Sequence, residues 1–372
     1  MNPVGKQDDL KVISNEELLK IAKARYKKAR DFCSEWREEA RKCQDYVAGR
    51  QWDDEEKAQL ETQGKAALVM NRIKPRVSAV VGMEIANRQE LRFQPREIAD
   101  NAVVGVLNDA SEWTRDQSMA EDHETDAFRD TVVTGMGWTE TLMDYTEYLD
   151  GMAIVRRRDP LCFDWDPNST EPNLSNRAYH FCSYDVDRSD FDALFPDYDG
   201  TPSKMALSVG DLWADSSKPH NASDAKFYPN QVPADEQKDT DRVRIVKYEY
   251  FSMESAWRVV KPSTGALALI TPEDADDLKK QMKAAGKAVE FNKIKSGQDV
   301  RLQAVIDGVL QIPYVEQKQR KFYRAYFTGD DVIEHEESPY PHGFTDNCIT
   351  WERDAQTDHW FGMVRGLLDP QE

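Results

Sequence analysis

The chain has 372 residues, with 68 acidic and 49 basic side chains, so its net charge at pH 7 is −19. This length allows two or three domains, each with its own core. No apolar run approaches the roughly 18 residues that span a bilayer, and MNPVGKQDDLK lacks the apolar segment of a signal peptide. The five cysteines are scattered without a C-x-x-C pair, which favours buried thiols in a reducing cytoplasm over disulfides or a zinc site.

The N-terminal part predicts one long amphipathic helix from about residue 15 to residue 48. Ser14 and Glu17 form an S-x-x-E capping box, and Gly49 is placed to end the helix. Apolar or small residues recur at alternating steps of four and three, which puts them on one face: Ala22, Tyr26, Ala29, Cys33, Trp36, Ala40, Cys43 and Val47. A helix on the order of 50 Å long needs a partner along its length, in its own subunit or in a neighbour.

Further helical segments are expected before the first strands. Asp53 and Asp54 are placed to cap a short helix that ends near Leu60. A second helix opens on Asn71 and Pro75 and runs from about residue 73 to residue 87. Residues 98–135 are also helical in pattern, with apolar stripes at Val103, Val106, Leu107, Ala110 and Trp113 and then at Phe128, Val132 and Val133.

After Gly135 and Gly137 the periodicity changes from helical to strand-like. Residues 138–148 and 152–158 flank an Asp-Gly turn and predict a hairpin. Residues 201–241 are rich in Ser, Pro, Asn, Asp and Lys, which indicates a long surface excursion. Strands follow at 242–251, 255–260 and 266–270, then a helix capped by Thr271, and strands near 300–312, 318–327 and 332–337. A final helix is expected from about Trp360.

The motifs that imitate a metal or nucleotide site fail at decisive positions. Asp164, Asp166, Asn168 and Thr170 have the spacing of a calcium loop, but serines stand where its glycine and its last glutamate are required. A turn capped by acidic side chains around Pro167 is therefore favoured. Gly64-Lys65 lacks the first glycine and the Ser/Thr of a phosphate loop, so ATP binding is not expected.

Two sets of side chains are candidates for catalysis. His180, Cys182 and Asp185 alternate along one predicted strand without an ordered base, which favours a structural role. Asp53 and Asp54 suggest a two-metal nuclease, whose remaining carboxylate and lysine are not identifiable. No catalytic or metal-binding residue is assigned.

Three segments, in this order, resemble the portal proteins of short-tailed bacteriophages. They are QWDD with NRIKP and NRQ between residues 51 and 89, FDWDPNSTEPNLSNRAYHF, and the final run ending in GMVRGLLDPQE. Each motif is moderately specific, but three in order are hard to obtain by accident. Portal proteins normally continue past the DPQ with a long helix, a channel loop and a crown, so the stem and crown part is expected to be absent here.

The resemblance implies an α+β portal-like subunit. Residues 1–240 would form a helical and mixed wing-like region, residues 241–340 a stem and clip-like α+β region, and residues 341–372 a loop and the start of a stem helix. The implied protein is a non-enzymatic component of the virion that assembles in the host cytoplasm. Twelve copies would form a ring at one capsid vertex, through which double-stranded DNA passes without sequence recognition.

The implied partners are other copies of the chain, the terminase large subunit, a tail or head-completion adaptor, and the coat and scaffolding proteins. No cofactor and no membrane contact are expected. Two alternatives from other classes stay open at this point: a metal-dependent nuclease or DNA-processing enzyme, and a cytoplasmic interaction protein that forms no ring.

Charge suggests three functional surfaces. Residues 65–96 are basic and residues 100–199 strongly acidic, so we expect a subunit interface at Arg72, Lys74, Arg76, Arg88 and Arg92. Docking of motor and adaptor is expected at Asp274, Asp276, Asp277, Lys279, Lys280 and Lys283. Channel or DNA contact, or simply a solvated strand face, is expected at Lys318, Arg320, Lys321 and Arg324. The acidic excess would let a duplex slide past a channel wall, or only keeps the protein soluble.

Overall fold

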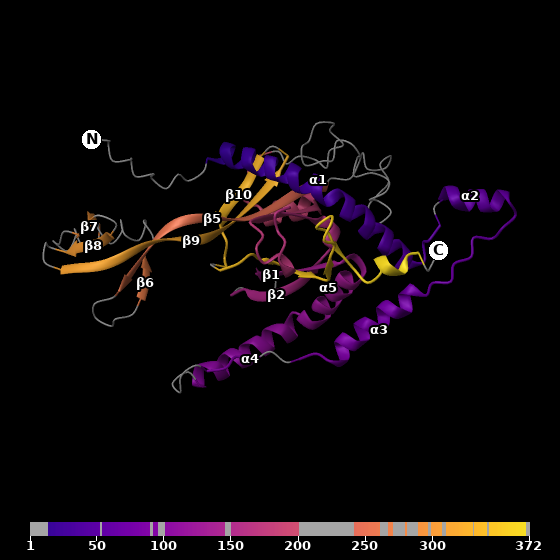
Figure 1. Cartoon of the computed structure of the whole chain (residues 1–372), viewed down its shortest axis with the longest axis horizontal. Coiled ribbons are helices and arrows are strands. Elements are labelled where there is room, and N and C mark those ends of the chain that lie inside the picture. The colour runs from indigo at the N-terminus through magenta and orange to yellow at the C-terminus, as the bar shows by residue number, and fades with distance from the viewer. Residues whose placement is uncertain are drawn as a thin grey trace. The chain divides into compact units, whose positions relative to one another are not determined.

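The computed structural model describes residues 14–52, 54–89, 92–95, 101–145, 150–200, 242–260, 267–270, 280, 289–296, 299–306, 310–329, 331–340 and 342–369. The chain divides into a large unit, residues 1–250, 324–339 and 344–372, and a small unit, residues 251–323 and 340–343. Both helices and strands are present (Figure 1), which agrees with the predicted α+β class. Within the described residues, no helix combines the length and apolar character that crossing a membrane requires.

Helix α1 (Asn15–Ala48) has the predicted ends and the predicted buried face. The Ser14 hydroxyl accepts the Glu17 N–H at 3.3 Å, and Gly49 ends the helix in the left-handed conformation with φ 83°. The whole predicted stripe is buried. It packs in its own subunit on an aromatic core, where Trp36 meets Trp165 edge to face at 5.0 Å between ring centroids.

The next helices are α2 (Asp54–Thr62), α3 (Ile73–Ala86), α4 (Asn101–Gln117) and α5 (Ala120–Thr134). Asn71 fixes the start of α3, because its Oδ1 accepts the Lys74 N–H at 2.9 Å while its Nδ2 donates to the Val47 carbonyl at 2.8 Å. The predicted helical segment 98–135 is two helices, since Met119 between them has a positive φ of 48° and breaks the hydrogen-bond ladder.

Two sheets follow the helices. The three-stranded sheet has the order β11-β1-β2, with β1 (Met136–Asp144), β2 (Met152–Arg158) and β11 (Asp346–Thr350) antiparallel. The predicted hairpin is β1 and β2. The eight-stranded sheet has the order β3-β4-β5-β9-β8-β7, with β10 paired to β9 and β6 to β5. Its strands are β3 (Phe163–Trp165), β4 (Tyr179–Asp187), β5 (Arg242–Val260), β6 (Leu267–Ile270), β7 (Val289–Ser296), β8 (Asp299–Ile306), β9 (Leu310–Thr328) and β10 (Asp331–Glu337).

Several expectations about the second half of the chain need correction. The expected strands 242–251 and 255–260 are one strand, β5, and the expected strand 300–312 covers β8 and the start of β9. Strand β7 was not expected at all. The expected excursion 201–241 and the expected helix 271–288, apart from Lys280, lie outside the described residues.

The predicted final helix is also wrong. Trp360–Phe361 form a short strand, β13, paired with β12 (Glu352–Arg353), and only a 3-10 turn at Arg365–Leu367 follows. Trp360 and Val364 are buried in two different cores. The chain passes so close to α5 that a Cβ at Gly362 would lie 2.4 Å from the Val132 carbonyl oxygen. Tertiary packing therefore decides the conformation of a segment whose apolar spacing is helical.

Candidate functional site

A cluster of buried charges lies where β1, β4, β5 and β11 meet in the large unit. Lys247 places its Nζ 2.8 Å from Asp346 Oδ2, 2.5 Å from Glu140 Oε1 and 3.9 Å from Glu249 Oε1. His180 Nε2 lies 3.0 Å from Asp346 Oδ2. All five side chains are buried, so each charge in the cluster depends on the others for its stabilisation.

Burial and these contacts fix the protons of the cluster. Burial lowers the pKa of His180, so its imidazole is neutral. Its Nδ1 accepts the Arg177 Nε–H at 3.3 Å, so Nε2 carries the proton and donates to Asp346. Burial alone would raise the pKa of Asp346, but Lys247 and the His180 hydrogen bond hold that pKa well below its usual range. Burial opposes the charge of Lys247, yet Asp346, Glu249 and Glu140 raise its pKa well above the ordinary value.

The cluster contains the one group of described residues whose donor atoms are close enough to hold a metal ion. Atoms of His180, Glu249 and Asp346 lie within 4.8 Å of one another. The donor set does not fit a metal, because the Lys247 ammonium already supplies the positive charge beside Asp346 and Glu249. Thr345, whose N–H donates to Glu249 at 3.0 Å, ties the start of β11 to β5. The cluster therefore joins distant strands.

The acidic motif at Asp164 and Asp166 also has a structural role. Asp164 is buried and accepts Arg37 Nη2 at 2.6 Å and Arg30 Nη1 at 3.3 Å, which ties β3 to α1. Asp166 Oδ1 accepts the Asn168 N–H at 3.0 Å. The predicted turn capped by acidic side chains is thus confirmed.

His180 and Asp185 have different partners, because His180 is hydrogen-bonded to Asp346 and Arg177. Burial raises the pKa of the Cys182 thiol well above its ordinary value, so the thiol stays protonated. Asp185 pairs with Arg244, whose Nε lies 2.7 Å from Oδ1. The structural role favoured from the sequence agrees with these contacts. Asp53 lies outside the described residues.

The five basic residues predicted at a subunit interface have different surroundings. Lys74 and Arg76 are exposed at the start of α3, as is Arg72 just before it. Arg88 is engaged within its own subunit, because its Nη1 donates to Glu121 Oε2 at 2.7 Å and its Nε to Glu84 Oε1 at 3.3 Å. Its guanidinium thereby connects α3 to α5.

Loop residue Arg92 lines a groove of about 440 Å3 against α4. The groove is mainly polar, and its lining includes Gln89, Asn108, Glu112, Arg115 and Glu121. Such a lining suits hydrated polar contacts rather than an apolar small molecule.

The basic residues predicted to contact DNA lie on β9. Arg320 stacks over the Phe251 ring at 4.7 Å, and Lys321 lies 5.7 Å from the Tyr323 ring centroid and 3.9 Å from Glu254 Oε2. Arg324, in the large unit, pairs with Glu336 on β10, and Lys318 is exposed. DNA contact by this strand stays a prediction. Of the residues predicted for motor docking, only Lys280 is described, and it is exposed.

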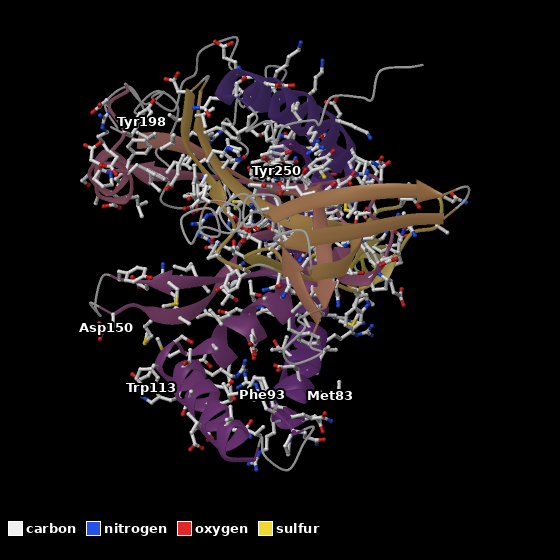
Figure 2. All side chains as sticks on the ribbon, turned by 90° about the vertical axis from the view of Figure 1, so that its left-hand side faces the viewer. Met83, Phe93, Trp113, Asp150, Tyr198 and Tyr250 are labelled. Carbon is white, nitrogen blue, oxygen red and sulfur yellow. The ribbon has the colours of Figure 1, made fainter. Side chains whose placement is uncertain are left out.

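Helix α4 turns its predicted apolar stripe outward. Val106 is 69% exposed and Trp113 53%, and none of the described α4 side chains is buried. Figure 2 shows Trp113 projecting from α4 on the side away from α3. The polar side of α4 faces the subunit: Asn108 Oδ1 accepts the Phe93 N–H at 2.7 Å, and Arg115 forms a bidentate pair with Glu124 at 2.8 and 2.7 Å. An outward apolar stripe of this kind is typical of surfaces that contact other molecules.

Residues 23–372 match the family described as Phage P22-like portal protein. The chain belongs to this portal protein family. A comparison with curated proteins returned no match. As a portal protein, the chain is a structural component of the phage capsid with a role in DNA packaging. The outward stripe of α4 suits such a component, because capsid proteins work in contact with other chains.

The buried charge cluster was missed from the sequence of this portal protein. Lys247 and Glu249 are two positions apart on a strand and therefore share a face, and both lie in the apolar run VRIVKYEYF. A lysine flanked by valine and tyrosine in such a run signals a buried, paired charge. Its partners Glu140 and Asp346 lie about a hundred residues away in either direction, so no local pattern could identify them.

Proposed function

We propose that this protein forms a closed ring at one vertex of the capsid, through which double-stranded DNA enters and leaves. The observation that carries the proposal is the match to the portal family over residues 23–372. The outward apolar stripe of α4 supports it, because such a surface is expected to be covered by another chain. By resemblance to short-tailed phage portals the ring has twelve subunits.

The charge of the subunit suits passage of DNA without retention. The net charge of −19 per subunit adds up around a ring, and a wall of like sign keeps the phosphates from adhering. Contacts with DNA are therefore expected to be sparse and independent of sequence. The basic side chains of β9 are the proposed exceptions.

Docking of the terminase large subunit and of a tail adaptor is proposed for the region around 251–323. Its predicted charged helix, with Lys279, Lys280 and Lys283 beside Asp274, Asp276 and Asp277, suits reversible contacts with successive partners. Charged rims of this kind steer association more than they add affinity. Coat and scaffolding proteins would contact the outside of the ring.

Ring formation is tested by mass photometry and negative-stain imaging of the purified chain over a range of protein and salt concentrations. The expected result is a single closed species with a central channel and a mass close to a whole multiple of the subunit. A chain that stays monomeric at every concentration and salt condition would contradict the proposal. DNA passage is tested separately, by packaging in particles that carry the chain.

A further inference from the structure

Residues 52–71 of the large unit form an arm. It consists of α2 and an extended segment that leads to α3 (Figure 1). Two hydrogen bonds fix its base: Trp52 Nε1 donates to the Leu68 carbonyl at 3.2 Å, and Asn71 Nδ2 donates to the Val47 carbonyl at 2.8 Å. Beyond this base, none of the described α2 side chains is buried. A helix of nine residues is marginal in water by itself, so the arm is expected to gain stability from a surface on which it lies.

The arm has the composition of a docking segment. Leu68 and Met70 are 74% and 72% exposed, although both are apolar. The stretch from Lys65 to Arg76, which covers the second half of the arm and the start of α3, contains four basic residues and no acidic one, whereas residues 53–61 contain five acidic residues and one lysine. The second half of the arm and the start of α3 therefore offer apolar and positively charged groups together, and their partner should offer apolar and negatively charged groups.

Helix α4 offers both kinds of group. Its apolar stripe includes Val106 and Trp113, and the exposed side chains of Asp109, Glu112 and Asp116 lie beside this stripe, where they also line the groove that α4 forms with Arg92. The one basic residue of α4, Arg115, is already paired with Glu124. Both the arm and α4 remain exposed within one subunit, so neither covers the other there.

A ring of identical subunits requires two different complementary surfaces on each chain, because every contact joins one side of a subunit to the other side of the next. We propose that the arm of one copy lies on the outward face of α4 of the adjacent copy. Leu68 and Met70 would cover the apolar stripe. Lys65 of the arm, with Lys74 and Arg76 at the start of α3, would face the acidic residues beside the stripe, Asp109, Glu112 and Asp116. This inference rests on the proposed ring.

The first test is cross-linking of two co-expressed variants, one carrying Leu68→Cys and the other Val106→Cys, with a short bifunctional maleimide. We expect covalent dimers from the mixture and only background from either variant alone, because the two cysteines meet only between copies. Four native cysteines are buried and Cys162 is half-buried, so each single variant also controls for them. Leu194→Cys, at an exposed apolar site on α6 (Arg188–Leu194), replaces Leu68→Cys as the matched control.

The second test is charge reversal. Lys74→Glu with Arg76→Glu, or Asp109→Lys with Glu112→Lys, should each raise the protein concentration at half-assembly by about tenfold, and the four changes together should restore part of the loss. Asp31→Lys with Glu35→Lys, exposed on α1, is the control and should leave assembly unchanged. If the wild type forms rings, but the two cysteine variants give no cross-link and charge reversal does not change assembly, the inference is overturned while the proposed ring stands. No ring from the wild type would overturn the proposed function and this inference with it.

Discussion

Replacement of Lys247 by methionine should destabilise the large unit strongly. Methionine has nearly the same length and flexibility, so the substitution removes the ammonium while it keeps most of the packing. The Lys247 side chain is 2% exposed and lies close to Asp346, Glu140 and Glu249. Removal of one partner from a buried ion pair costs about 3–5 kcal/mol, because the remaining charge stays buried without compensation.

The control is Arg156→Met, in the same part of the molecule. Arg156 on β2 pairs with Asp144 at 3.1 Å, but its side chain is 50% exposed. An exposed pair of this kind contributes about 0–1 kcal/mol. The two variants therefore remove one cation each and differ in burial, so the difference between them isolates the effect of burial.

Urea unfolding followed by tryptophan fluorescence measures both variants, since Trp36, Trp138 and Trp165 lie in the core that α1 shares with β1 and β3. At pH 8 Lys247→Met should lose several kcal/mol relative to Arg156→Met. Addition of Asp346→Asn to Lys247→Met should recover part of the loss by removing an uncompensated carboxylate. If the two single variants lay within about 1 kcal/mol of each other, the argument from burial would be refuted.

The pH dependence of the free energy of unfolding should also change sign in Lys247→Met. In the wild type the pKa of Asp346 is held below its usual range, so its contribution is complete above the ordinary value near 4 and is lost as the pH falls further. In Lys247→Met the Asp346 carboxylate loses its cation, so burial, which acts to raise the pKa of Asp346, is no longer offset by the ammonium. The variant should therefore be least stable at high pH and regain stability as the pH falls toward 5.

Three further outcomes are expected. Burial lowers the pKa of His180, so below about pH 6.5 this histidine is protonated in the unfolded chain but stays neutral in the native state. The free energy of unfolding should therefore fall by up to about 1.4 kcal/mol for each pH unit below that value. Urea midpoints between pH 5 and 8 should show a weaker slope for His180→Gln, and an identical slope would count against this assignment. Gly135→Ala should cost about 3 kcal/mol or more, because its φ is 90° and a Cβ would lie 2.5 Å from the Phe361 backbone. Gly49→Ala, with φ 83° but a nearest atom at 3.6 Å, should cost only about 1 kcal/mol, and equal thermal shifts would contradict the steric argument. Replacement of Lys279, Lys280 and Lys283 by Glu should abolish terminase pull-down without affecting assembly. The same change at the exposed Lys20, Lys27 and Lys28 of α1 is the control and should leave terminase binding intact. Retained binding by the Lys279, Lys280 and Lys283 variant would exclude the predicted helix 271–288 as the docking site.

The features that were predictable from the sequence are those fixed by local interactions. Ser14, Glu17 and Gly49 bracket α1 correctly because capping depends on residues within one turn of the helix end. The hairpin of β1 and β2 follows from strand periodicity around Asp150-Gly151. The turn at Asp166 forms because its carboxylate accepts a backbone N–H only two residues away.

The predictions that were wrong or incomplete concern features that depend on contacts between distant segments. Trp360, Val364 and Leu368 have helical spacing, but the segment is held against α5 and divides its apolar side chains between two cores. The α4 stripe has correct helical periodicity, yet periodicity does not say whether a face meets its own core or another chain. Lys247 needs partners from β1 and β11, which only the folded chain brings together.

Burial distinguishes two kinds of helix in the large unit: those whose apolar face is buried within the subunit, and those whose apolar face we expect to be buried only on assembly. Helix α1 and its aromatic core are closed, whereas α2 and α4 have no buried side chain among those described. Helix α5 connects the two kinds of helix. It is held to the sheet by its Asp130 carboxylate, which pairs with Arg157 on β2 at 2.6 Å, and Gly362 packs closely against it.

The same helix holds both proposed ring surfaces. Arg88 connects it to α3, where the arm ends, through Glu121, and Arg115 of α4 reaches it through Glu124. A displacement of the arm by one neighbour would therefore act on α5 first, and through α5 on the face of α4 that receives the next arm. Since α5 is held to the sheet by buried contacts, it should transmit such a displacement with little deformation. Adjacent contacts in the ring are thus expected to be coupled through α5, and weakening of the Arg88–Glu121 pair should reduce the cooperativity of assembly more than its affinity.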